Sequence, residues 1–109
     1  MIYGAMNFPV NPIAEEIKLI SSLGFDYLEL AMDPPAAHHT FIRNQKDEIL
    51  DALGRKDMSL ICHLPTFLST ADLTQSIRRA SLREVIASLE VAAALGVSKA
   101  VLHPSYVTG

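Results

Sequence analysis

The strongest constraint on the fold is a hydrophobic pattern that changes its period several times along the chain. Short apolar runs, typical of buried strands, alternate with longer segments whose apolar residues recur at helical spacing. Glycine or proline stands close to most of these changes, where a strand or helix has to end. The alternation predicts an α/β protein in which helices connect parallel strands.

Four segments have the composition of short strands: residues 2–7, 25–32, 59–65 and 99–104. Their apolar residues occupy both faces, as in strands of a sheet that is covered on both sides. Proline closes the second, third and fourth segments. Proline has no amide hydrogen to give to a strand ladder, so each segment is expected to end there.

Three helices are expected between these strands. The first begins at Asn11-Pro12, which we interpret as a cap followed by a proline in the first helical turn, and it ends at Gly24. The other two cover about residues 45–53 and 73–95, and a glycine suited to a left-handed cap follows each. In the longest helix we expect one broad apolar face, made by Ile77, Leu82, Val85, Ile86, Leu89, Ala92 and Ala93.

Two architectures fit this order of elements. A doubly wound sheet needs nothing more, but no G-x-G-x-x-G or Walker-type phosphate loop follows any expected strand, so the usual nucleotide-binding signature is missing. The other architecture is the opening half of a TIM barrel, whose complete form takes about 250 residues. In a chain of 109 residues, four of the eight barrel strands can be present.

Composition excludes some classes of function. The net charge of −3 disfavours a chain that holds DNA by broad neutralisation of phosphates. A single cysteine, Cys62, cannot form an internal disulfide, and no secretory leader is visible, so a cytoplasmic location is expected. No apolar stretch reaches the ~20 residues of a membrane-spanning helix, so no membrane partner is expected.

Two histidines, His63 and His103, stand in the same context, as the last residue of an apolar strand with a proline one or two positions later. Ligand sites in parallel α/β folds gather at the carboxyl ends of the strands, so both imidazoles are expected on one rim. Two neutral imidazoles on neighbouring strands suit Zn²⁺ or a similar metal, although a catalytic zinc usually takes three protein ligands. Hydrogen bonding at the strand ends, or substrate binding without metal, is the alternative. Cys62 and Leu102 should then face the helices.

Other polar residues have simpler explanations. Glu29, between two leucines, is expected to project into the barrel interior, where it binds substrate, orients a ligand or serves as a structural hydrogen-bond partner. His38 and His39 are expected in a solvated loop after the second strand. Cys62 is interpreted as a small buried apolar residue rather than a nucleophile.

At this point the sequence resembles a known family. The segments HLPTFLSTAD at 63–72 and SIRRASLREVIASLEVAAALGVSKAVLHPS at 76–105 are similar to endonuclease IV and the wider xylose isomerase-like TIM barrel superfamily, which includes sugar phosphate isomerases and epimerases. GFDYLEL at 24–30 is similar to the superfamily's second strand. The resemblance implies an α/β fold of parallel (βα) units, with the first four strands and three helices of a TIM barrel. Residues 1–109 would then form a single domain, the N-terminal half of a longer barrel.

The resemblance also implies site residues. In the endonuclease IV branch the two strand-end histidines are metal ligands, and this role falls on His63 and His103. Glu29 takes a common glutamate position and is expected to bind substrate. Ser105 stands where the family often has glycine. The family's remaining ligands, including a glutamate on the fifth strand, have no counterpart within the 109 residues, so a divalent metal, Zn²⁺ or Mn²⁺, would have an incomplete site.

Three functions follow as hypotheses. The first is the N-terminal part of a metal-dependent sugar phosphate isomerase or epimerase, inactive by itself, with a sugar or sugar phosphate as its partner. The second is an endonuclease IV-like zinc phosphodiesterase acting on abasic DNA, which the acidic charge disfavours. The third is a non-catalytic half barrel. An open half barrel exposes strand edges and apolar interior surface, so we expect it to form homo-oligomers.

Overall fold

The computed structural model describes residues 1–105. Its strands form one parallel sheet and are β1 (Gly4–Met6), β2 (Tyr27–Ala31), β3 (Ser59–His63) and β4 (Ala100–Val101). Their order in the sheet is β1-β2-β3-β4, which is also their order in the chain. In a doubly wound sheet the order of the strands reverses, because later strands are added on the other side of the first one. In a barrel wall each strand lies beside the one that precedes it in the chain. The sheet order therefore confirms the half barrel.

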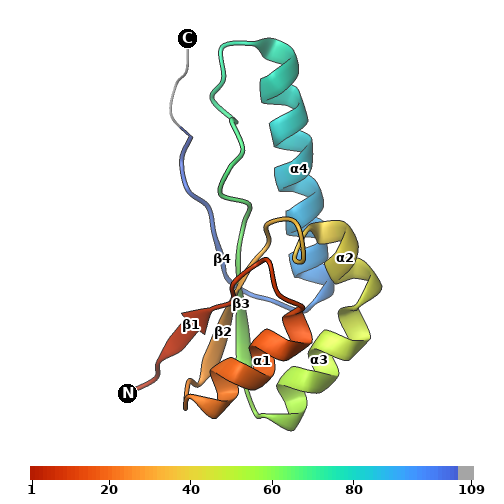
Figure 1. The fold of residues 1–109 in the computed structure, drawn as a ribbon. Helices are drawn as coiled ribbons and strands as arrows, with labels where there is room; N and C mark the ends of the chain where they lie inside the picture. Colours follow the sequence, from red (N-terminus) through yellow and green to blue (C-terminus); the bar gives the residue numbers. More distant parts are fainter. Residues whose placement is uncertain (106–109) are drawn as a thin grey trace.

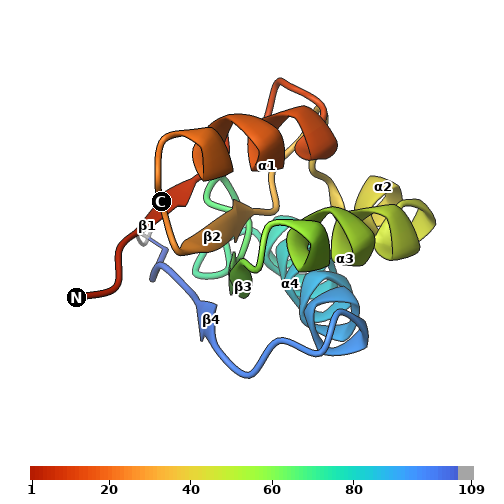
Figure 2. The ribbon, with the colours of Figure 1, turned by 90° about the horizontal axis from the view of Figure 1, so that it is seen from below.

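The helices lie along one side of this sheet, as Figures 1 and 2 show from two directions. They are α1 (Ile13–Ser22), α2 (His39–Asn44), α3 (Lys46–Arg55) and α4 (Gln75–Ala94). The opposite side of the sheet, which would be the interior of a closed barrel, carries no helix in the described residues. Side chains on that open face can therefore take part in a site.

Two details of the expected helices were wrong. There are four helices in the described residues rather than three, because His39, expected in a loop, begins the separate helix α2. His38 has an extended backbone and its ring accepts a hydrogen bond from the Thr40 amide, so a histidine takes the capping role usually filled by serine or aspartate. Asn11 does not cap α1; Pro12 occupies the capping position, and no side chain caps the helix.

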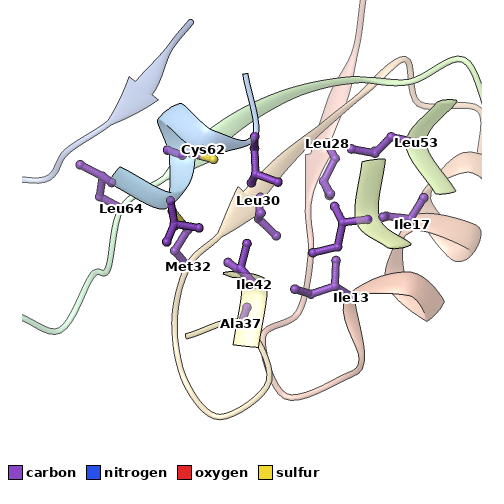
Figure 3. Packing of buried hydrophobic residues seen from close by; sticks show 14 of the residues in the cluster. Ile13, Ile17, Leu28, Leu30, Met32, Ala37, Ile42, Leu53, Cys62 and Leu64 are labelled. Atoms are coloured by element: carbon purple, nitrogen blue, oxygen red, sulfur yellow. The ribbon is translucent and has the colours of Figure 1, made fainter. Parts of the chain in front are cut away.

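The hydrophobic core lies between the sheet and the helices (Figure 3). Leu28 and Leu30 of β2 point into it and are fully buried, and isoleucines of α1, α2 and α3 cover them. Cys62 of β3 is also fully buried there, as expected from the sequence. Burial raises the pKa of the Cys62 thiol to about 12, so the thiol stays protonated and is a poor nucleophile.

The longest helix buries only part of the expected face, Val85 and Ala92. The buried residues of α4 are mostly small: Ser81, Val85, Ser88, Val91 and Ala92. The large aliphatic side chains of Leu82, Ile86 and Leu89 are 43–50% exposed, because they lie on the face that turns away from the sheet and α2. A further helix or a second chain would be needed to cover them. No helix in residues 1–105 combines the length and the hydrophobicity needed to cross a membrane.

Candidate functional site

The site begins with a hydrogen bond between two neighbouring strands. His63 is the last residue of β3, as expected, and Glu29 lies two residues before the end of β2. Both alternate with the fully buried residues of their strands, so they project from the open face of the sheet. His63 Nδ1 and Glu29 Oε2 are 2.8 Å apart. The histidine side chain is 7% exposed and the glutamate side chain 23%, so water competes little for this bond.

The second histidine reaches the first from the next strand. The ring centroids of His63 and His103 are 4.8 Å apart, and the rings are tilted by 41° to each other. The predicted meeting of the two imidazoles at one rim is therefore confirmed. The expected position of His103 was wrong, because β4 ends at Val101 and His103 follows two residues later.

The chain leaves the sheet after Val101 because the last ladder bond runs from the Leu64 amide to the Val101 carbonyl. Leu102, expected against the helices, is 56% exposed for the same reason. His103 is exposed as well, whereas His63 is buried. The pair thus joins one fixed imidazole to one that faces solvent.

A cleft of about 480 Å³ opens beside His103. Its walls are two loops, residues 66–69 after β3 and residues 103–105 after β4. Ser105 joins the loops, because its hydroxyl accepts a hydrogen bond from the Thr70 amide at 2.9 Å and donates one to the Leu68 carbonyl at 2.9 Å. The serine that stands where the family often has glycine therefore shapes the cleft.

Asp33 holds the other end of the first loop. It is 6% exposed, and its carboxylate accepts hydrogen bonds from the Thr66 amide at 3.0 Å and from the Thr66 hydroxyl at 3.4 Å. The sequence showed Asp33 only as the residue before two prolines, so this role was missed. Asn7, directly after β1, was missed too; its Oδ1 accepts from the Ala31 amide at 2.7 Å, and its buried Nδ2 has no partner among the described residues.

The Glu29–His63 bond determines which ring nitrogen can bind a ligand. A carboxylate only accepts hydrogen bonds, so the shared proton lies on Nδ1 of His63 and leaves Nε2 as an electron-pair donor. Metal-binding histidines are commonly oriented in this way. The donor set therefore fits two imidazole ligands of a borderline metal such as Zn²⁺. In residues 1–105 it lacks a third ligand, because the one group of three close ligating residues is His38, His39 and Glu84 on the helices.

Comparison with known proteins agrees with the barrel-type sheet order. The family model for the xylose isomerase-like TIM barrel matches residues 17–109. The chain belongs to the xylose isomerase-like TIM barrel family. Comparison with curated protein sequences gives no significant match.

Two solved structures share the fold of this chain. The 3-keto-D-glucoside 4-epimerase YcjR from E. coli has a TM-score of 0.69 and 19% identity, over 94% of this chain and 38% of that one. A D-tagatose 3-epimerase-like protein has a TM-score of 0.78 and 18% identity, over 99% of this chain and 39% of that one. This chain thus spans less than two fifths of either neighbour. At these identities the likeness establishes the fold.

Proposed function

We propose that this chain supplies the first half of a metal-dependent sugar or sugar phosphate isomerase or epimerase. The observation that carries the proposal is the convergence of His63 and His103 beside a cleft, with Glu29 fixing one of the two rings. Membership of the family and the two epimerase neighbours support the substrate class. Residues 1–109 would form one domain of this larger barrel.

Each residue has a distinct proposed role. His63 and His103 hold a divalent metal, Zn²⁺ or Mn²⁺, through imidazole nitrogens, and Glu29 keeps the His63 ring in the binding tautomer. A bound metal would polarise a hydroxy-carbonyl unit of the sugar. The side chain of Glu29 is partly exposed at the rim, so its carboxylate can also accept a hydrogen bond from a sugar hydroxyl. The cleft beside His103 receives the rest of the sugar.

The 109-residue chain is expected to bind rather than to catalyse. Epimerisation by proton transfer needs acid–base groups on both faces of the substrate, and the described residues place one carboxylate, Glu29, beside the histidine pair. The neighbours are more than twice as long, and the further groups would come from the part that this chain does not span. A cytoplasmic location is also proposed, because Cys62 is a free, buried thiol, as is usual in a reducing compartment.

One observation favours a second function, an endonuclease IV-like phosphodiesterase. The pair His63 and His103 brings two imidazoles together on neighbouring strands, which suits the zinc chemistry of that branch. The net charge of −3 argues against it, because a DNA-binding face gains most of its affinity from lysine and arginine. Sugar binding is therefore the preferred proposal.

We also propose that the chain by itself associates with a second copy. β1 and β4 are the edges of the sheet, and Tyr3, Met6 and Leu102 beside them are 47–58% exposed. Leu82 and Ile86 on the outer face of α4 add further exposed apolar surface. Two four-stranded halves supply the eight strands of a closed barrel, which would cover both edges.

Ligand binding followed by NMR tests the proposed function. The chain is titrated with a ketose, with its phosphate and with a short abasic duplex, each with and without Zn²⁺. We expect the sugar to shift the amide signals of the cleft loops, and His103→Ala to abolish these shifts while the control variant Glu90→Ala, at an exposed position of α4, keeps them. Equal binding by His103→Ala, or a response to the duplex alone, would contradict the proposal.

A further inference from the structure

A second group of ligating side chains lies in the helical layer, away from the cleft. His38 caps α2, His39 is its first residue, and Glu84 lies in the middle of α4. Glu84 Oε2 is 3.2 Å from His38 Nε2 and 2.6 Å from His39 Nε2. The two imidazole rings lie against each other, with centroids 4.0 Å apart. One carboxylate oxygen therefore receives two imidazole nitrogens from a different helix.

A simple tether between helices does not need all three groups. Both rings approach the same carboxylate oxygen, and protonation of both rings would place two positive charges side by side. One such hydrogen bond would suffice to hold α2 on α4. A single cation that replaces the two protons between the imidazoles and the carboxylate would bind all three side chains at once.

We propose that His38, His39 and Glu84 form a divalent-metal site of the Zn²⁺ type that fastens α2 to α4. The three ligand atoms lie within 4.8 Å of one another. Ligands around a tetrahedral zinc are ~3.4 Å apart when each metal bond is about 2.1 Å long. The His38–Glu84 distance already fits, the His39–Glu84 distance must lengthen by about 0.8 Å, and the partly exposed Glu84 side chain can move.

The surroundings supply what such a site needs. His38 Nδ1 accepts from the Thr40 amide while Nε2 carries the proton; when a metal takes Nε2, the proton moves to Nδ1, where the Thr40 hydroxyl at 2.8 Å can accept it in place of that cap. His38 and Glu84 are 27% and 42% exposed in their side chains, so water can enter and fill the fourth position. Burial raises the pKa of Glu84, but the hydrogen bond from His39 and the charges of His39 and His38 outweigh it, and the net pKa lies below its ordinary value. Glu84 is thus an anionic ligand at neutral pH.

The role of this site would be structural, and it bears on the cleft indirectly. The segment that leads from β2 to α2 contains Asp33, whose carboxylate holds the Thr66 amide at the edge of the cleft. A metal that fixes the start of α2 fixes the far end of this segment. The site is separate from the histidine pair on the open face of the sheet, so it can be loaded and removed independently.

Counting bound ions in matched variants tests the proposal. Zn²⁺ binding to the 109-residue chain is measured by equilibrium dialysis, and Co²⁺ is used to report the coordination number by visible absorption. In the background His63→Ala/His103→Ala we expect one ion to remain, with four-coordinate Co²⁺ absorption. Adding Glu84→Gln should weaken that ion at least tenfold, whereas Glu90→Gln, on the exposed side of the same helix, should not.

The Glu84→Gln variant is chosen because it keeps the metal-free fold. A glutamine oxygen still accepts a hydrogen bond from His39, so the far-UV circular dichroism without metal should match that of Glu90→Gln. His39→Asn provides a second, independent loss of ligand. The proposal is wrong if the His63/His103 background binds no ion, or if its ion is held equally well after Glu84→Gln and after His39→Asn. If replacing His63 and His103 removes one ion and a second ion remains bound, the lost ion belonged to the proposed sugar site and not to this one.

Discussion

The bond between Glu29 and His63 gives the most quantitative prediction. Replacing Glu29 by leucine leaves Nδ1 of His63 without a partner, in a side chain that is 7% exposed. An unsatisfied buried donor costs about 1–3 kcal/mol of unfolding free energy. In a domain of about this size that cost lowers the Tm by roughly 4 °C per kcal/mol, so by about 4–12 °C.

Glu29→Gln separates the charge from the hydrogen bond. The amide oxygen still accepts from Nδ1, and only the difference between a charged and a neutral acceptor is lost, about 1 kcal/mol. The Zn²⁺ affinity of the His63/His103 pair should fall about 10–100-fold in both variants, since loss of a carboxylate that orients a ligating histidine has effects of that size.

Thermal unfolding followed by circular dichroism, and Zn²⁺ titration calorimetry, measure the two effects. The control is Glu90→Gln, because Glu90 is exposed on α4. The reasoning is refuted if Glu29→Leu unfolds at the same temperature as the control. It is also refuted if Glu29→Leu and Glu29→Gln bind Zn²⁺ as tightly as the unaltered chain, because Glu29 would then not orient His63.

Three further predictions concern the rest of the molecule. Ser105→Ala breaks the bonds that join the cleft loops and should cost about 1–2 kcal/mol in urea unfolding; an unchanged midpoint would contradict this role. The Cys62 pKa is raised from 9.0 to about 12, so the folded state favours the thiol, and this stability is present below pH 9 and is lost as the pH rises toward 12. The destabilisation caused by Cys62→Ala should therefore shrink by about 1.4 kcal/mol between pH 8 and pH 10, and a constant difference would exclude a buried thiol. Light scattering at micromolar concentration should give a dimer or larger species, converted to a monomer by Leu82→Glu with Ile86→Glu; a monomeric unaltered chain would rule out self-association.

The fold could be predicted because its information is local. Period changes and the glycines after α1 and α4 mark where helices end, and Gly24 and Gly96 do adopt the positive φ that favours glycine. The short helix α2 was missed because its cap is a histidine, which no general capping preference marks. The exposed face of α4 was misjudged because periodicity shows that a face is apolar but not which neighbour covers it.

The candidate site was predictable to the level of its histidines. Strand ends of a parallel sheet converge, so the positions of His63 and His103 in their strands were enough to bring the rings together. The meeting of His38 and His39 with Glu84 spans 45 residues or more and depends on how α4 packs on α2. Such long-range contacts between helices leave no pattern in a single sequence.

One measurement tests the central claim most directly. Long-range ¹H–¹⁵N NMR spectra of the imidazole rings report, for each histidine, which nitrogen carries the proton and which binds a metal. We predict that one equivalent of Zn²⁺ at the open face shifts the His63 Nε2 signal and a ring-nitrogen signal of His103 together, with the His63 proton on Nδ1 throughout. Separate titration of the two rings, or a His63 proton on Nε2, would contradict the shared site.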